Sequence, residues 1–465
     1  MSAHPLPSLL EMSRALDAGQ ITSEVLVRTH LDRITQHAET LNCFVEVQAD
    51  AALADARQCD ADRRTGRGRG PLHGIPLAHK DMYHRAGHLC EYGARAMAGH
   101  RPDKTGPLMA RLNDAGALSL GRLHMSEFAM GPTGHNAHLG RCCNPWNTDY
   151  ISGGSSSGSG AAVAAGLAAG ALGSDTGGSV RLPAAMCGVA GLKPTQGMLP
   201  QGGMMGLSES LDCPGVLARS AQDVALLFTT LADNGTDYAS GIDAGVDGMC
   251  FGIPTSWYFD DLDTQIADRL TDLRRDLEKR GAIFRDVAVP DHTNLGEMAN
   301  IVFTPEAAAL HADRMQSHPD HYGPQVLSRL SQGLTISAVQ YRQALQLRAA
   351  HARAMMAATF ANCDLVFAPV LRAPVPTAAA ADVGAGADMR ALIAGLSDLT
   401  RPVSYLGFPA LSVPAGFDAA GLPIALQLIG PPLSEATLLR AGAAAERDVG
   451  HIPPCTAKIG TRNDR

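Results

Sequence analysis

Apolar residues recur along this chain with the period of a helix in two clear places. The first stripe spans residues 27–34 and follows a Thr-Ser pair at 22–23 that can cap a helix. The second stripe spans residues 266–277 and ends shortly before Gly281, a residue that favours the left-handed conformation at a helix end. The pattern therefore predicts an amphipathic helix at each position.

Short apolar runs lie between such helical stretches, at residues 365–368, 411–413 and 424–429. Their length and their flanking turn formers favour buried strands. Helices that alternate with buried strands indicate a sheet covered by helices on both faces, so the fold class is α/β. An Ala/Gly-rich segment at residues 161–171 predicts a helix with a small face, packed tightly in the core. Residues 233–248 and 373–388 are typical of surface loops or pocket lids.

Composition places the chain among large globular proteins. It has 465 residues, of which 45% are hydrophobic and 18% are charged, enough to bury a large core. Length alone allows two domains, but no linker composition appears near the middle and we found no internal repeat. We therefore expect a single domain over residues 1–465.

Charge and cysteine usage narrow the range of partners and compartments. The net charge of −8 and the absence of a basic run argue against autonomous nucleic-acid binding. The N-terminus lacks a basic region followed by an apolar core, and the Ala/Gly stretch is too short and too weakly apolar to span a bilayer. Ten dispersed cysteines resemble reduced thiols more than a disulfide framework. We expect a cytoplasmic protein without a membrane partner, and possible association with further copies of itself.

The Gly/Ser-rich stretch at residues 151–181 is the most informative part of the chain. Within it, residues 175–179 end in a serine, Ser179, on a glycine-rich turn. Successive amide N–H groups of such a turn can point into one concavity that suits a developing oxyanion. A hydroxyl beside such a site indicates acyl transfer, but serine is a weak nucleophile and requires a base.

Lys80 is the candidate base. It ends an apolar segment at residues 74–80, which would carry its ammonium group toward the interior. Burial lowers the pKa of a lysine because the charged form loses hydration, and a shift of about 3 units would leave much of it neutral near pH 7. Taken alone, a lysine is more often a surface or ion-paired residue.

The same residues allow other interpretations. Residues 154–158 also fit the G-x-S-x-G elbow of α/β-hydrolases, with Ser156 as nucleophile. That elbow follows a buried strand, whereas residues 143–150 contain a proline and several turn formers. A flexible linker is the remaining alternative for the glycines. No spacing typical of metal ligands is present, so we expect neither a metal nor a cofactor.

Taken together, residues 74–81, 151–158 and 174–181 resemble the amidase signature family. The resemblance implies a Ser–cis-Ser–Lys triad of Ser179, Ser155 and Lys80, with a cis peptide bond before Ser155. It further implies an oxyanion hole formed by backbone amides. These are the amides of Thr176, Gly177, Gly178 and Ser179.

Further blocks extend the resemblance along the chain, at residues 191–195, 210–212, 409–416 and 422–430. It covers nearly the whole sequence, from about Ile21 to about Arg440, with a signature core at about 71–215. The fold that it implies is a large mixed β-sheet of about eleven strands wrapped by helices.

Residues expected to contact the substrate are Ala129, Met130, Ser155 and Arg181. Residues 129–131 match the loop that lines the acyl side of the site in the family. Arg181 can contact a substrate carboxylate or hold its own loop through buried hydrogen bonds. Arg329 matches an arginine that clamps the glutamine carboxylate in the amidotransferase branch, although it also fits a solvated helix.

The sequence therefore predicts an amidase that hydrolyses a small carboxamide with water, through an acyl-enzyme on Ser179. An alternative within the family is the A subunit of a tRNA-dependent amidotransferase, which acts with a companion protein. Carbamates, esters and lactams are alternative substrates, because the same acyl-enzyme chemistry serves them. A non-catalytic binding module is the remaining alternative, and the complete set of triad residues argues against it.

Overall fold

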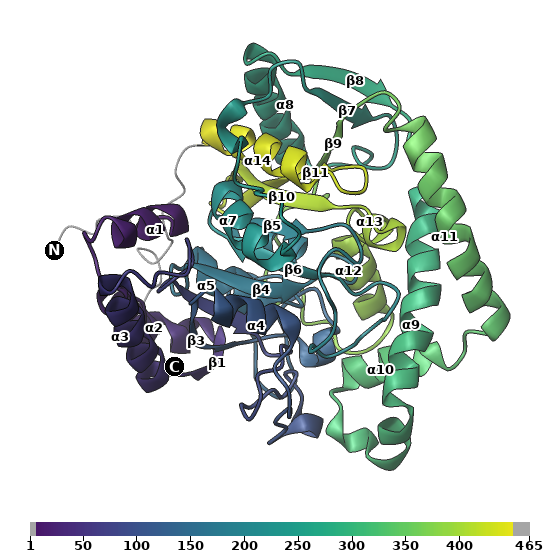
Figure 1. Cartoon of the computed structure of the whole chain (residues 1–465). Helices are drawn as coiled ribbons and strands as arrows, with labels where there is room; N and C mark the ends of the chain where they lie inside the picture. Colours follow the sequence, from purple (N-terminus) through teal and green to yellow (C-terminus); the bar gives the residue numbers. More distant parts are fainter. Residues whose placement is uncertain (1–5, 450–465) are drawn as a thin grey trace.

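The computed structural model of the protein describes residues 6–449 (Figure 1). Its centre is one sheet of eleven strands in the order β1-β3-β2-β4-β6-β5-β10-β11-β9-β7-β8. The strands are β1 Phe44–Val47, β2 Pro76–Lys80, β3 Leu118–Leu123, β4 Gly170–Ser174, β5 Ala190–Lys193, β6 Pro214–Ala218, β7 Cys250–Pro254, β8 Ile283–Val287, β9 Leu365–Pro369, β10 Ala410–Phe417 and β11 Pro423–Ile429.

The sheet is mixed. Strand β2 runs parallel to both β3 and β4, and β7 runs parallel to both β8 and β9. The other pairs are antiparallel, including the long β10–β11 pair. Parallel pairs require crossover connections, which the intervening helices supply. The mixed α/β fold expected from the sequence is confirmed.

Fourteen α-helices are present among the described residues. They are α1 Leu9–Asp17, α2 Ser23–Leu41, α3 Ala49–Arg64, α4 Pro107–Asp114, α5 Ser157–Ala164, α6 Arg181–Cys187, α7 Ala221–Ala232, α8 Thr264–Lys279, α9 His292–Ser317, α10 Pro324–Gly333, α11 Ala338–Ala358, α12 Ala387–Ser397, α13 Arg401–Leu406 and α14 Glu435–Val449.

Helices cover both faces of the sheet. Neighbouring residues of β6 illustrate this, because side chains of a strand alternate between faces. Val216 packs into the cluster that contains α7 and α14, whereas Leu217 packs into the cluster that contains α5 and α6. Contacts on the second face are close: a Cβ on Gly191 would lie 2.6 Å from the Ala184 side chain. Small residues thus let the helices approach the strands.

The helices and strands predicted from periodicity are present. Thr22 caps α2 by accepting a hydrogen bond from Val25, and α8 buries its apolar stripe against the sheet. The three apolar runs form β9, β10 and β11. The stretch at 233–248 holds only the short 3-10 helix Ile242–Ala244, and the stretch at 373–388 continues into α12.

The extent predicted for the Ala/Gly-rich helix was wrong. Helix α5 begins earlier, at Ser157, and ends at Ala164, and strand β4 begins at Gly170. Gly166 adopts a positive φ of 65°, which suits glycine and ends the helix. The packing within the helix is nevertheless tight, since a Cβ on Gly158 would lie 2.3 Å from the carbonyl oxygen of Cys43.

Helices α9, α10, α11 and α13 pack on one another beside the sheet, on the right of the molecule in Figure 1. Two of them, α10 and α13, bring residues from the C-terminal half toward the Gly/Ser-rich loops. Within residues 6–449 no helix is both long and apolar enough to cross a bilayer. A single domain that extends over residues 1–465 stays a prediction.

Candidate active site

Lys80 lies at the end of β2, in the interior of the protein. Because β2 is flanked by β3 and β4, its last residue is enclosed, and the Lys80 side chain has no exposed surface. The Nζ atom lies 2.7 Å from the Ser155 hydroxyl and 2.8 Å from the Ser174 hydroxyl. Burial lowers the pKa of Lys80 to about 7, although the charges of Asp212 and Asp175 act in the opposite direction. A substantial fraction of the amine is therefore neutral near pH 7 and able to accept a proton.

Ser155 is held in the turn that leads into α5. The peptide bond between Gly154 and Ser155 is cis, as the family resemblance implied. The Ser155 carbonyl oxygen accepts a hydrogen bond from the Ser126 amide at 3.2 Å, and the side chain is completely buried. A Cβ on Gly154 would lie 2.4 Å from the Gly131 carbonyl oxygen, so only glycine fits there.

Ser179 lies on the loop between β4 and α6, beside the Ser155 turn. The Ser156 amide donates to the Ser179 carbonyl oxygen at 3.3 Å, which joins the two serine-bearing segments. Unlike Ser155, Ser179 is partly exposed, and it lines a pocket. Among the described residues, the Ser179 hydroxyl has no hydrogen-bond partner. The fold thus brings Lys80, Ser155 and Ser179 into one region from distant parts of the sequence.

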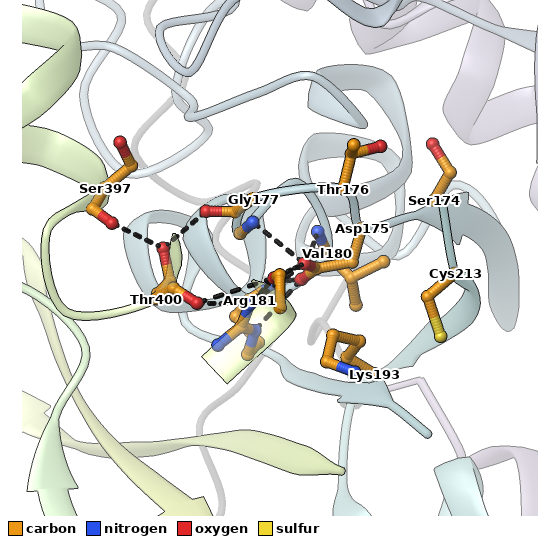
Figure 2. Close-up of polar contacts among 12 residues, drawn as sticks. Ser174, Asp175, Thr176, Gly177, Val180, Arg181, Lys193, Cys213, Ser397 and Thr400 are labelled. Carbon is orange, nitrogen blue, oxygen red and sulfur yellow. Dashed lines mark hydrogen bonds and ion pairs between the residues drawn. The ribbon is translucent and has the colours of Figure 1, made fainter. Parts of the chain in front are cut away.

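The shape of the Ser179 loop depends on Asp175 (Figure 2). Its buried carboxylate accepts hydrogen bonds from the Gly178 amide at 2.8 Å and the Val180 amide at 3.2 Å. It also accepts two from Arg181, at 3.0 and 2.9 Å. Burial raises the pKa of Asp175, but the charge and hydrogen bonds of Arg181 outweigh it and lower the pKa to about 2. The aspartate therefore stays ionised and holds the loop.

Arg181 stabilises the loop that carries Ser179 and does not face the pocket. Its guanidinium has no exposed surface and also binds the Gln427 side chain, the Thr400 carbonyl and the Ser404 hydroxyl. It is not among the residues that line the pocket. This geometry contradicts the expected substrate contact and supports the alternative, a structural role.

The four amides expected to form an oxyanion hole differ in whether they already have a hydrogen-bond acceptor. The Gly178 amide already donates to Asp175, so the prediction that Gly178 belongs to this set is corrected. The amides of Thr176, Gly177 and Ser179 have no acceptor among the described residues. All three of these residues line the pocket. Gly178 has a φ of +134°, and a Cβ there would lie 2.3 Å from the Thr400 hydroxyl, which explains the glycine.

Of the other residues predicted to contact the substrate, some line the pocket and some do not. Ala129 lines the pocket, with a positive φ of 59°, whereas its neighbour Met130 is buried in the core and does not line it. Ser155 is completely buried and is not a lining residue either. Arg329, by contrast, does line the pocket. It lies in α10, and its guanidinium stacks over the Phe303 ring at 5.4 Å.

The elbow alternative has no support in the structure. Ser156 has no exposed surface, and its hydroxyl donates to the Ser174 carbonyl oxygen at 3.3 Å. It is absent from the residues that line the pocket. Residues 143–150, which precede this segment, contribute only isolated bridges and no strand.

Sequence reasoning missed three residues around the pocket. Asp212 accepts a hydrogen bond from the Thr176 hydroxyl at 2.7 Å and from the amides of Leu207 and Ser208, and burial raises its pKa to about 6. Its only sequence signal was its place in a family block. Arg401 and Ser397 also line the pocket, and no motif marked either of them.

No three His, Cys, Asp or Glu side chains gather into a metal-binding group within the part of the chain that the structure describes. A partly neutral lysine touches a buried serine, and a second, accessible serine lies on a loop with three amides that have no acceptor among the described residues. This combination is the one that acyl transfer requires: a base, a nucleophile and donors for an oxyanion.

Comparison with known proteins identifies the family of this chain. The sequence matches the Amidase family over residues 25–439. The chain belongs to this family, the amidase-signature enzymes.

Proteins similar to this chain have different activities. The A subunit of the glutamyl-tRNA(Gln) amidotransferase of Nitrosococcus oceani is 34% identical over 463 residues, covering 93% of this chain and 95% of that protein. Its counterpart in Chloroflexus aurantiacus is 36% identical over 466 residues, covering 93% and 94%. A crystal structure of an amidase has a TM-score of 0.87 at 32% identity and covers 96% of this chain and 100% of that one. The peptide amidase of Stenotrophomonas maltophilia has a TM-score of 0.82 at 28% identity, with 96% and 98% covered.

Proposed function

We propose that this enzyme hydrolyses the amide bond of a small carboxamide through an acyl-enzyme on Ser179. The observation that carries the proposal is the contact of 2.7 Å between a completely buried Lys80, with a pKa of about 7, and Ser155. An amine in this state is matched to proton transfer near neutral pH. Solved structures of amidases with the same fold support the reaction class.

In the proposed reaction, the Ser179 oxygen attacks the carbonyl carbon of the substrate. Its proton passes to the Ser155 oxygen while the Ser155 proton passes to Lys80 Nζ. The amides of Thr176, Gly177 and Ser179 donate to the carbonyl oxygen as it becomes negative. Lys80 then returns the proton through Ser155 to the leaving nitrogen, and the C–N bond breaks.

Water completes the cycle. It enters as the amine leaves and gives up a proton along the same path, and its oxygen attacks the ester carbon of the acylated Ser179. Collapse of the second tetrahedral intermediate returns that proton to Ser179 and releases a carboxylic acid. Nothing in this sequence of steps consumes a cofactor.

Labelling with a fluorophosphonate tests the nucleophile directly. The reagent phosphonylates an activated serine, and mass spectrometry of the digested protein locates the adduct. We expect the adduct on Ser179 and no labelling of Ser179→Ala. Ser156→Ala is the matched control, because that serine is the nucleophile of the elbow alternative, and this variant should still be labelled. An adduct on Ser156 in the wild-type protein would overturn the proposal.

A second candidate is the A subunit of an amidotransferase, in which ammonia from glutamine passes to a partner. The similarity to amidotransferase A subunits over 93% of the chain favours it, as does the position of Arg329 in the pocket. This candidate predicts efficient release of ammonia from glutamine and activation by a companion protein. Turnover of glutamine, measured beside simple amides, esters and carbamates, separates the two candidates.

A further inference from the structure

Two arginines line the pocket that contains the candidate nucleophile. Arg329 lies in α10 and Arg401 begins α13, and both line the pocket that contains Ser179. The two side chains lie close enough that the charge of Arg401 lowers the pKa of Arg329, which burial brings to about 9. Two like charges placed together in a partly dehydrated pocket repel each other, and an anion between them relieves the repulsion.

Arg329 has an unused hydrogen-bond donor. Its Nη1 atom is buried and has no hydrogen-bond partner among the residues that the structure describes. The guanidinium stacks on Phe303, an arrangement that holds the plane of the group and leaves its edge available. A buried guanidinium nitrogen without an acceptor is costly, so the site is suited to a ligand oxygen.

Arg401 lies next to the glycine loop. A Cβ placed on Gly177 would be 3.8 Å from Arg401 Nε, so this arginine borders the amides proposed to bind the oxyanion. Its Nη2 donates to the hydroxyl of Ser397, which also lines the pocket and which Figure 2 shows across from Gly177. Burial lowers the pKa of Arg401, while Glu297 and Asp398 raise it. Asp398 is itself bound by Arg372, which reduces its effect.

Among the described residues no acidic side chain lines the pocket itself, although Glu297 and Asp398 act on Arg401 from outside its lining. Of the residues described, those that line it are apolar, hydroxyl-bearing, amide or glycine residues apart from Arg329 and Arg401. A substrate with a carboxylate therefore finds two cationic donors there. A substrate with an ammonium group finds no anion and two like charges.

We propose that the pocket selects amides that carry a carboxylate and no ammonium group, such as the monoamides of short dicarboxylic acids. Arg329 and Arg401 together bind that carboxylate while the amide carbonyl lies at Ser179. This inference rests on the proposed function and names its substrate class. It also separates the two candidates above, because glutamine carries an ammonium group beside its carboxylate.

Three compounds of equal chain length provide the test. Glutaramate has a carboxylate, pentanamide has a methyl group in its place, and glutamine has the carboxylate with an added ammonium group. We expect kcat/KM for glutaramate to exceed that for pentanamide by at least about 30-fold, the lower range for a desolvated charge pair. We expect it to exceed that for glutamine by at least about 10-fold. Equal values for glutaramate and pentanamide, or a preference for glutamine, would overturn the inference.

Substitutions then assign the preference to the arginines. Arg401→Gln and Arg329→Gln should each reduce the ratio of glutaramate to pentanamide by about 10-fold or more. Arg401→Lys should retain part of it, since the charge remains but the forked geometry is lost. Arg390→Gln is the matched control: Arg390 is exposed on the neighbouring helix α12 and does not line the pocket. If the Arg329 and Arg401 variants changed this ratio no more than Arg390→Gln does, the preference could not be assigned to the two arginines.

A binding measurement distinguishes failure of this inference from failure of the proposed function. Calorimetry with the Ser179→Ala protein reports ligand affinity without turnover. Tighter binding of glutaramate than of pentanamide and glutamine supports the inference even if no compound in the panel is hydrolysed. Hydrolysis of neutral amides by the wild-type enzyme, without any preference in binding, overturns the inference and leaves the proposed function standing.

Discussion

Substitution of Lys80 and titration of its amine examine the central element of the proposed mechanism. Among the residues described, Lys80 is the only base that contacts Ser155. Its Nζ lies 2.7 Å from the Ser155 hydroxyl. A neutral amine accepts a proton and an ammonium ion does not. The rate of amide hydrolysis should therefore follow the neutral fraction of this one side chain.

The magnitude follows from the shift in pKa. Burial moves the Lys80 pKa from 10.5 to about 7, so about half of the amine is neutral at pH 7. Without the shift the neutral fraction would be smaller by roughly 10³-fold, and the shift corresponds to about 5 kcal/mol. Because the neutral form is active, kcat/KM should fall about tenfold per pH unit below pH 7. It should level off above about pH 8.

Steady-state kinetics on a matched amide and ester, between pH 5 and pH 9, provide the assay. Lys80→Ala removes the base and should lower kcat/KM for the amide by about 10²–10⁴-fold. Lys80→Arg should be equally impaired, since a guanidinium stays charged. Losses for the ester should be smaller, because an alcohol leaves more easily without protonation than an amine. Lys104→Arg, at an exposed lysine, is the control for the same exchange.

Two results would refute this reasoning. Near-wild-type amide hydrolysis by Lys80→Arg would exclude Lys80 as the base. A pH profile that continued to rise up to pH 9, without levelling off, would mean that the active base titrates as an ordinary lysine. Thermal unfolding of each variant checks that a loss of activity is not a loss of fold.

Three further outcomes follow from the same geometry. Asp212→Asn removes a charge that raises the Lys80 pKa, so the acid limb of the rate profile should move to lower pH, and an unchanged or opposite shift would contradict the proposed coupling. Arg181→Met leaves the buried Asp175 carboxylate without its cation and should destabilise the protein by about 3–5 kcal/mol in denaturant unfolding, whereas a loss below about 1 kcal/mol would disprove the structural role. Activity should survive EDTA and exhaustive dialysis, and a loss that only zinc restores would argue against the serine mechanism.

Several helices and strands of the fold could be predicted from the sequence. Period and length alone predicted α2, α8 and the strands β9, β10 and β11, because these segments bury one continuous face or lie wholly inside the sheet. The Ala/Gly-rich stretch failed as a boundary prediction. Small residues there satisfy both a helix and a strand, and the backbone of Gly166 decides where one ends.

Chemistry that resides in a local motif was also predictable. The glycine-rich turn with Ser179 and the strand that ends in Lys80 are each a single short segment, and the resemblance to the amidase signature family joined them. The family membership is confirmed over residues 25–439. The roles proposed for the triad stay predictions, for which the Lys80–Ser155 contact is the main support.

Only the tertiary structure determined the direction in which each charged side chain points. Sequence left Arg181 open between a substrate contact and a loop brace, and the buried Asp175 settled its direction by supplying a counter-charge six residues away. It left Arg329 open as well, and gave no sign of Arg401. Both reach the Ser179 pocket because α10 and α13 pack beside the sheet. A motif fixes neighbours along the chain, whereas the charge balance of a pocket is set by residues that only the fold brings together.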